Sequence, residues 1–262
     1  MSEQPIGIFD SGVGGTSIWY EIQRLLPYES TVYLADSKNA PYGEKSGEAI
    51  IRLSKKNTDF LLSRGCKLIV VACNTATTNA IDHLRTHYAL PFIGIEPAIK
   101  PAALNSRSGK VGVLATRGTL GSQLFHSTSK LHAGGIELVE REGRGLVELI
   151  ESGKANSPET RVLLKQYLQP MLDAQIDHLV LGCTHYPYLI PLLRELLPDT
   201  VRIIDCGEAV ARQTLRVLQE KKLLNNGSVK GHHEFYSNGD AAILRSFVEA
   251  VPADIEVNSL DF

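Results

Sequence analysis

One order of elements occurs twice in this chain, and this repeat restricts the fold more than any other feature. Ile6 and Val111 open similar segments 105 residues apart, and Cys73 and Cys183 lie in similar segments 110 residues apart. The matching segments are 6–12 with 111–118, 31–36 with 136–140, 68–75 with 178–185, and 92–96 with 201–205. Because four elements keep their order and nearly constant spacing, the repeat indicates a duplicated half-domain rather than a short solenoid unit.

Short apolar runs alternate with amphipathic segments, which is typical of an α/β protein with parallel sheets and right-handed crossovers. We therefore expect two similar α/β halves. The predicted strands are 6–10, 31–36, 68–72, 92–96, 111–115, 136–140, 178–182, 201–205 and 232–236. The predicted helices are 15–26, 46–63, 75–88, 119–132, 158–174, 187–197, 207–223 and 240–250.

Two short segments mark where the chain passes between the halves. Residues 97–101 contain two prolines, and Cys206-Gly207 follows the last strand of the second half. We expect the chain after residue 207 to return to the first half. The predicted domains are therefore 1–97 with 207–262, and 98–206.

The two matching cysteines, Cys73 and Cys183, each follow a buried strand and precede a helical pattern. Open α/β sheets place their ligands at the carboxyl ends of the strands. Two thiols at such ends suggest an acid/base pair, one on each side of a substrate. The alternative is that each cysteine is a small buried hydrophobic residue. If the pair is functional, we expect the two sulfurs to face each other roughly 7 Å apart, which is two near-attack distances of ~3–3.5 Å.

The composition excludes several classes of protein. The 262 residues are 43% hydrophobic, which suffices for one large or two small domains, and the net charge of −2 offers nothing to nucleic acid. No apolar run approaches the roughly 20 residues of a membrane helix, and residues 1–5 do not resemble a signal peptide. We therefore expect a cytoplasmic protein with four free thiols, of which Cys66 and Cys206 are structural.

Three other features have competing interpretations. The glycine-rich turn 10–16 lacks the lysine of a phosphate loop. It predicts either a tight turn with positive φ or backbone N–H groups that hold a small anion. His83 and His87 share a helix face, but without a glutamate between them a metal site is not indicated, and no metal is expected. Trp19 is interpreted as a packing residue.

Seven motifs together resemble the glutamate racemases of the aspartate/glutamate racemase family. They occupy residues 9–15, 40–43, 72–77, 94–97, 115–119, 181–187 and 235–240. The resemblance covers nearly the whole chain, and Pro41-Tyr42-Gly43 favours the glutamate enzymes over their relatives. Residues 36–40 depart from it, since many relatives carry Asp-Thr-Ala-Arg and an apolar residue there; this affects only the shape of the loop.

The resemblance implies two flavodoxin-like halves related by a pseudo-twofold axis, with the active site in the cleft between them. It implies that the enzyme interconverts L- and D-glutamate without a cofactor and works as a homodimer. The product D-glutamate would supply peptidoglycan synthesis, and with it the cell wall and cell shape. It implies catalytic roles for Cys73, Cys183, Asp10, His185 and Glu151. The implied substrate contacts are Asp10, Ser11, Pro41, Tyr42, Gly43, Asn74, Thr75, Thr116, Thr119, Thr184 and His185.

The residue types fit this chemistry. Racemisation removes the α-proton from one face and returns one to the other, so one group must act as base and another as acid. A thiol, with a pKa near ~8.5, can serve as either. A protonated His185 would favour the thiolate of Cys183. An ionised Asp10 would instead disfavour the thiolate of Cys73, so Asp10 must accept a proton or orient Cys73. Glu151 is either an acid near His185 or an exposed helix carboxylate.

The α-carbanion also needs hydrogen-bond donors, because the sequence shows no electron sink. Asn74, Thr75 and Thr184 follow the two cysteines and are placed to donate, although such residues are also good helix N-caps. Three other functions remain open at this point. They are a racemase for aspartate or a hydantoin, a non-catalytic two-lobe ligand-binding protein, and an acyl-transferring Cys/His enzyme that would use Cys183 alone.

Overall fold

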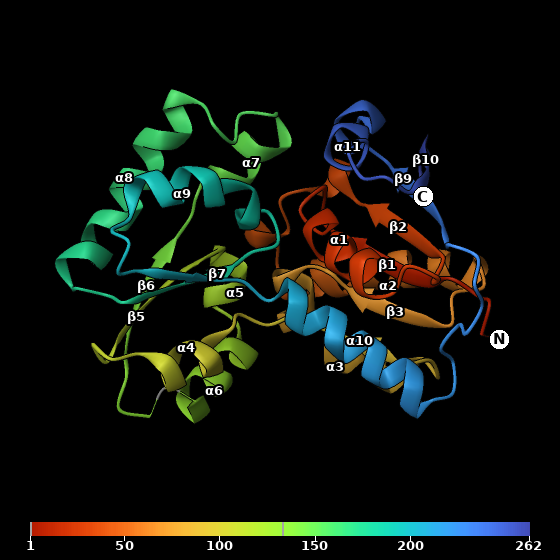
Figure 1. Cartoon of the computed structure of the whole chain (residues 1–262), viewed down its shortest axis with the longest axis horizontal. Helices are drawn as coiled ribbons and strands as arrows, with labels where there is room; N and C mark the ends of the chain where they lie inside the picture. The colour runs from red at the N-terminus through yellow and green to blue at the C-terminus, as the bar shows by residue number, and fades with distance from the viewer. Residues whose placement is uncertain (1, 133) are drawn as a thin grey trace. The chain divides into compact units, whose positions relative to one another are not determined.

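The chain forms two parallel β-sheets flanked by helices, as the sequence predicts (Figure 1). This computed structural model describes residues 2–132 and 134–262. The first sheet contains β1 (Ile6–Asp10), β2 (Thr31–Ala35), β3 (Leu68–Val71), β4 (Phe92–Ile93), β9 (His232–Ser237) and β10 (Asp254–Ser259) in the order β10-β9-β2-β1-β3-β4. The second contains β5 (Lys110–Ala115), β6 (Glu137–Glu142), β7 (His178–Gly182) and β8 (Arg202–Ile204) in the order β6-β5-β7-β8.

The repeat in the sequence corresponds to a repeat in topology. The order β2-β1-β3-β4 in the first sheet is the order β6-β5-β7-β8 in the second. The register agrees as well, since Ile6 lies opposite Leu68 and Val111 lies opposite His178. The segments that the sequence pairs are therefore equivalent strands, and β9 and β10 extend only the first sheet.

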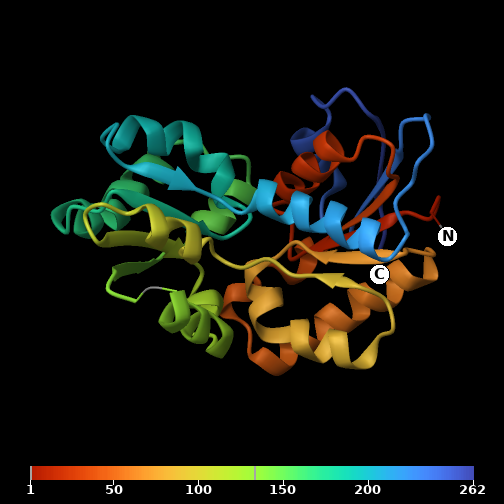
Figure 2. The same ribbon diagram turned by 60° about the horizontal axis from the view of Figure 1, so that its bottom comes forward.

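The described chain divides into two compact units, one running up to Ile95 and continuing at Gly207–Phe262, the other spanning Glu96–Cys206. In the first, α1 (Thr16–Leu25) packs on α10 (Gly207–Glu220), and α2 (Gly47–Ser63) packs on α3 (Asn74–His87). Figure 2 shows these two pairs on opposite faces of the sheet. The short helices η1 (Ser37–Asn39) and η2 (Tyr42–Glu44) follow β2, and α11 (Ala241–Val248) lies against β9 and β10.

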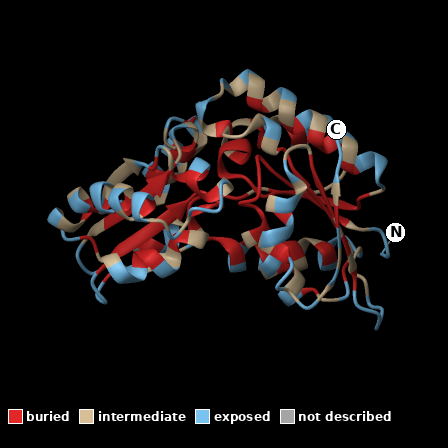
Figure 3. Ribbon diagram, turned by 90° about the horizontal axis from the view of Figure 1, so that it is seen from above, coloured by how far each residue is buried: buried red, intermediate tan, exposed pale blue. Residues whose placement is uncertain are grey.

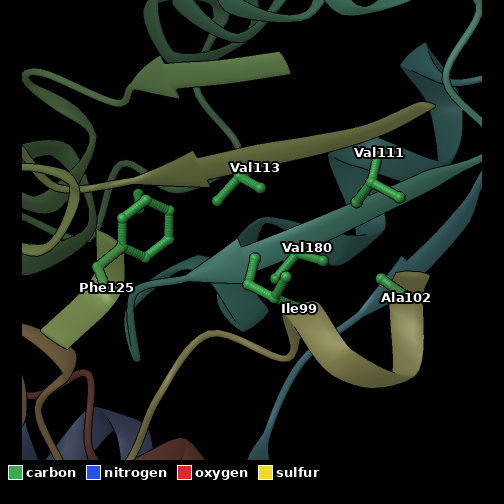
Figure 4. Packing of buried hydrophobic residues seen from close by; sticks show 7 residues of the cluster. Ile99, Ala102, Val111, Val113, Phe125 and Val180 are labelled. Atoms are coloured by element: carbon green, nitrogen blue, oxygen red, sulfur yellow. The ribbon is translucent and has the colours of Figure 1, made fainter. Parts of the chain in front are cut away.

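The second unit has shorter helices around its sheet. These are α4 (Ile99–Asn105), α5 (Arg117–Leu120), α6 (Gln123–His132), α7 (Leu146–Glu151), α8 (Pro158–Asp173), η3 (Tyr186–Leu189) and α9 (Ile190–Leu196). Helix α4 packs on α6, and α8 packs on α7 and α9. Figure 4 shows a core between α4, α6 and the strands, formed by Ile99, Ala102, Val111, Val113, Phe125 and Val180.

Burial follows the position of each strand in its sheet. The central strands β1, β2, β3 and β7 are buried at every residue, as their apolar runs predict (Figure 3). Strand β6 is an edge strand and carries three glutamates, so it is nowhere fully buried. The strands β3 and β7, which precede the two cysteines, are thus covered on both faces.

Some predicted elements are wrong in length or were missed. The predicted helix 119–132 is two helices, because Thr116 caps α5 and the Ser122 hydroxyl accepts a hydrogen bond from Phe125 N at 3.2 Å to begin α6. The segment 97–101, predicted as a crossing, already enters α4 at Ile99. Helices α4 and α7 and edge strand β10 were not predicted, since six- or seven-residue segments carry too little periodicity.

The glycine-rich turn after β1 does not have the positive φ that one of its two interpretations predicts. None of Gly12, Gly14 and Gly15 has a positive φ, and Gly15 has φ −63°. Space, rather than backbone conformation, requires glycine at position 15. A Cβ there would lie 2.7 Å from Asp10 Cβ and 2.8 Å from Tyr33 Oη. The turn therefore lets the start of α1 approach the end of β1 closely.

Candidate active site

Each unit gathers its candidate residues at the carboxyl edge of its sheet. In the first unit, Ala72 N donates to Phe9 O at 2.8 Å and Asp36 N donates to Asp10 O at 3.0 Å. These bonds continue the sheet by one residue beyond β1, β2 and β3. Asp10, Asp36 and Cys73 therefore leave the sheet at the same edge.

The second unit repeats this arrangement. Ala115 lies opposite Gly182, and Gly143 N donates to Ala115 O at 3.0 Å. Cys183 is consequently the counterpart of Cys73, and Gly143 is the counterpart of Asp36. Thr116 occupies the place of Ser11.

Cys73, Ser11 and Asp10 form a hydrogen-bonded chain, which we call the Cys73 cluster. The Cys73 Sγ donates to Ser11 Oγ at 3.8 Å, and Ser11 Oγ donates to Asp10 Oδ1 at 3.3 Å. Asp10 is fully buried, and its Oδ2 accepts from Gly15 N at 2.6 Å at the start of α1. One backbone N–H of the glycine-rich turn thus binds Asp10. The cluster contains a proton acceptor but no cationic side chain.

Asn74 begins α3 directly after Cys73 and is a buried amide with no partner in the described structure. It is 2% exposed, and neither its Oδ1 nor its Nδ2 makes a hydrogen bond. Leaving both atoms of a buried amide unpaired is costly, so native proteins rarely do so away from a ligand or water. Asn74 therefore is a ready donor and acceptor beside the Cys73 sulfur. Thr75, the next residue, is also buried.

Tyr42 lies close to this edge, but its hydroxyl is already engaged. It follows the cis Ala40–Pro41 bond and donates to Asp36 Oδ2 at 2.5 Å, while Asn57 Nδ2 donates to it at 3.2 Å. Burial, followed by the Asp36 charge, raises the pKa of Tyr42 well above its usual value. The Tyr42 hydroxyl is therefore already paired, which leaves its ring and backbone to contact a ligand. Gly43 has no side chain and can offer only its backbone.

Cys183, His185 and Glu151 form the corresponding group in the second unit, which we call the Cys183 cluster. His185 is 1% exposed; its Nδ1 lies 3.8 Å from Cys183 Sγ and its Nε2 lies 2.6 Å from Glu151 Oε1. Burial lowers the pKa of His185, but its hydrogen bonds to Cys183 and Glu151 outweigh burial and raise the pKa well above the usual 6.5. An imidazolium that donates to both partners is the favoured form.

Two predicted residues take positions that bear on this cluster. Glu151 ends α7, and its side chain is only 18% exposed, so it is not the exposed helix carboxylate that the sequence left as an alternative. Thr184 is 3% exposed. Thr116 Oγ1 accepts from Thr119 N at 3.3 Å and caps α5, so the expected contacts Thr116 and Thr119 lie at the start of this helix.

The sequence did not identify Tyr186 or Asp36 as functional. The fully buried Tyr186 hydroxyl donates to Gly143 O at 3.1 Å. Burial, followed by the Cys183 charge, raises its pKa well above the usual value. Its position next to His185 was the available signal. Asp36 could have been suspected because it is the charged residue that directly follows β2.

Several residues outside the two clusters are engaged in packing or burial. All four cysteines are free and buried, as expected, and burial raises the pKa of Cys66 to about 12. The rings of His83 and His87 stack with centroids 3.9 Å apart. Trp19 is a packing residue in edge contact with His233 and Phe235. Within residues 2–132 and 134–262 no three metal-ligating side chains form a group, and no helix is long and apolar enough to cross a membrane.

Comparison with known proteins identifies the family. Residues 16–214 match the family model described as Asp/Glu/Hydantoin racemase. The glutamate racemase of Herpetosiphon aurantiacus is 47% identical over 242 residues, which cover 92% of this chain and 95% of that protein. A glutamate racemase isoform from Bacillus anthracis has a TM-score of 0.90 at 31% identity, covering 100% of this chain and 99% of that one. The Escherichia coli glutamate racemase in complex with L-glutamate and an activator has a TM-score of 0.86 at 33% identity, covering 97% and 99%. With these matches and the repeated cysteine-bearing edges, this chain belongs to the glutamate racemases, within the Asp/Glu/hydantoin racemase family.

Proposed function

We propose that this chain interconverts L- and D-glutamate, with Cys73 and Cys183 as its two acid/base residues. The observation that carries the proposal is the equivalence of the two thiols: neither is in a disulfide, both are buried, and each lies just after the third strand of its repeat. The E. coli relative, which binds L-glutamate, supports the choice of substrate.

In the proposed reaction one sulfur starts as thiolate and removes the α-proton, while the other starts as thiol and protonates the opposite face. The roles exchange for the opposite enantiomer. By family resemblance, Cys73 acts on D-glutamate and Cys183 acts on L-glutamate. This proposal requires the two sulfurs to face opposite sides of the bound α-carbon, on the order of 7 Å apart.

The two clusters would prepare their cysteines by different routes. The Ser11–Asp10 chain offers Cys73 an acceptor for its proton, so Asp10 would help to form the thiolate by accepting or orienting. The His185 imidazolium instead stabilises negative charge on Cys183, and Glu151 holds the imidazolium in place. Each thiolate would then be supported without a cofactor.

Donors near the sulfurs would stabilise the carbanion. Asn74 has an unused amide beside Cys73, and the buried Thr184 is the counterpart of Asn74, since it directly follows Cys183. Preorganised donors of this kind are worth about 10²–10³ in kcat each when they contact developing charge. The proposed set of substrate contacts is completed by Asp10, Ser11, Pro41, Tyr42, Gly43, Thr75, Thr116, Thr119 and His185.

Solvent deuterium tests the reaction. A two-base racemase places deuterium at the α-carbon of glutamate as it turns over, whereas a non-catalytic binder leaves the α-proton in place. An acyl-transferring Cys/His enzyme would also leave it and would not need Cys73. The assay should run D-glutamate, L-aspartate and a hydantoin side by side, because turnover of either of the last two above that of glutamate would contradict the choice of substrate.

We further propose that the enzyme works in the cytoplasm as a homodimer and supplies D-glutamate for peptidoglycan. Its family carries this role, and each part has a direct test. Rescue of a D-glutamate-requiring bacterial strain would support the role in the cell wall. Sedimentation equilibrium would report the assembly, and a mass of one chain at micromolar concentration would contradict the dimer.

A further inference from the structure

A buried carboxylate holds the segment that carries Tyr42. Asp36 is fully buried and directly follows β2. Its Oδ2 accepts from the Tyr42 hydroxyl, and its Oδ1 accepts from Asn39 Nδ2 at 2.8 Å and from Asn238 Nδ2 at 2.5 Å. Lys56 Nζ lies 3.6 Å from Oδ1. Asp36 thus ties four side chains together, and one of them comes from about two hundred residues further along the chain.

That distant residue, Asn238, binds both the backbone and the side chains of this segment. Its Oδ1 accepts from Lys38 N at 2.9 Å, and its own N–H donates to Ala35 O at 3.3 Å. The next residue must be small, because a Cβ on Gly239 would lie 2.8 Å from Ser37 Cβ. The turn after β9 therefore lies directly on the start of the 36–44 segment.

Residues 260–262 form a second layer over the same segment. Leu260 N donates to Ser237 O at 2.9 Å, which fixes the course of this stretch. Lys38 Nζ then lies 3.2 Å from both carboxylate oxygens of Asp261. The ring of Phe262 lies 5.4 Å from that of Phe60, and Lys56 Nζ lies 5.3 Å from the Phe262 ring centroid. Through Lys38 and Lys56 this layer reaches the residues around Asp36.

We propose that Asn238, Asp261 and Phe262 are positioning residues for the substrate, because they hold the 36–44 segment where Tyr42 and Gly43 contact it. The inference rests on the function proposed above. A segment already fixed in the folded protein need not lose conformational freedom when the ligand binds, so fixing it raises affinity. At the corresponding position of the second unit stands Gly143, which has no side chain and accepts from the Tyr186 hydroxyl through its backbone carbonyl.

This role predicts a specific kinetic signature. Positioning residues that act on binding raise KM and leave kcat and its pH dependence nearly unchanged. The rise should be the same for L- and D-glutamate, because these residues do not act on either sulfur. We expect Asp261→Asn and Phe262→Ala each to raise KM for both enantiomers by about two- to fivefold, the range of an exposed ion pair for the first and of an exposed cation–π contact for the second.

Exposed residues make this test possible without unfolding the protein, since the Asp261 side chain is 77% exposed. A double-mutant cycle sharpens it: Lys38→Ala, Asp261→Asn and their combination should raise KM equally, because each breaks the same ion pair. Arg212→Ala is the matched control, since it removes an exposed ion pair with Glu208 in the same unit and should leave KM unchanged. At the half-buried Asn238, the substitution Asn238→Ala should raise KM by about tenfold through loss of a hydrogen bond to a charged group.

Several outcomes would overturn the inference. An unchanged KM in Asp261→Asn, Phe262→Ala and their combination would do so, as would a loss of kcat in one direction only. If the effects of Lys38→Ala and Asp261→Asn on KM were additive, the ion pair between Lys38 and Asp261 would not be the cause of the rise in KM. A wild-type protein with no racemase activity on glutamate would instead contradict the proposed function, so the two failures can be told apart.

Discussion

The Cys73 and Cys183 clusters occupy the same topological position but surround their sulfurs with opposite chemistry. Cys73 meets a hydroxyl and a buried carboxylate, whereas Cys183 meets a buried imidazolium. Topology therefore fixes where each sulfur stands, and the neighbouring side chains differ. In the proposed reaction, which runs in both directions, each sulfur would have its own route to the thiolate.

The first way to break this comparison is to remove either sulfur. Cys73→Ser and Cys183→Ser should each abolish racemisation, at least about 10⁴-fold, because both faces need a competent acid or base. Each variant should still eliminate a leaving group from one enantiomer of a substrate analogue with its remaining thiol. Cys66→Ala serves as the control and should keep full activity. Full racemase activity in either serine variant would refute the two-base assignment.

The second test removes the proton partner of one sulfur at a time. His185→Asn should slow turnover from L-glutamate more than from D-glutamate, by about 10²–10⁴-fold. Asp10→Asn should show the opposite preference. Chelator should leave the wild type unaffected. Equal losses in both directions with only weaker binding would assign both residues to substrate positioning, and activity restored by zinc after chelation would point to a metal.

The third test concerns the carboxylate behind His185. Glu151→Gln should slow turnover from L-glutamate by about tenfold, since a hydrogen bond between charged groups is worth roughly 1.5–3 kcal/mol. Glu151 helps to raise the pKa of His185, so its loss lowers that pKa. As the pH rises, the variant should therefore lose the activity that depends on the imidazolium at a lower pH than the wild type does. A pH–rate profile from L-glutamate that does not move would contradict this link.

The smallest effect on turnover is expected from a buried histidine outside the clusters. Burial lowers the pKa of His233 to about 4, so the unfolded chain binds its proton first as the pH falls. The free energy of unfolding should therefore fall between pH 6.5 and about 4, by up to about 3 kcal/mol. His185 has the opposite sign: its contribution is complete below pH 6.5 and is lost as the pH rises through its raised pKa.

His233→Asn isolates the contribution of His233 to the loss of stability in acid. The amide oxygen of asparagine can still accept from the Thr31 hydroxyl, which lies 3.0 Å from His233 Nδ1. Denaturant unfolding at pH 7 and pH 4.5 should show a smaller acid loss in the variant than in the wild type. The two proteins should have the same racemase activity at pH 7. An identical acid loss in both would show that His233 does not titrate in this way.

Much of the fold was predictable because the central strands are continuous apolar runs and the repeat confirms each of them. The positions of Cys73 and Cys183 followed from the ends of those strands. The contacts of Asp36 with Asn238 did not, because they join residues that no local pattern relates. Helix α7, which carries Glu151, was missed since its six residues span fewer than two turns. The positive φ expected in the first turn was wrong, because crowding at Gly15 has no signature in a single sequence.

The shared strand order also has a consequence for evolution. In a pair of identical half-length chains, any mutation beside the cysteine would appear on both sides of the substrate. In one chain with two copies of the unit, Asp10 and His185 can change independently, and selection can act on the rate for each enantiomer separately. Asp36 and its counterpart Gly143 show the same freedom, since one copy carries a buried carboxylate where the other has no side chain. Duplication within one chain thus allows a symmetric framework to diverge one side at a time.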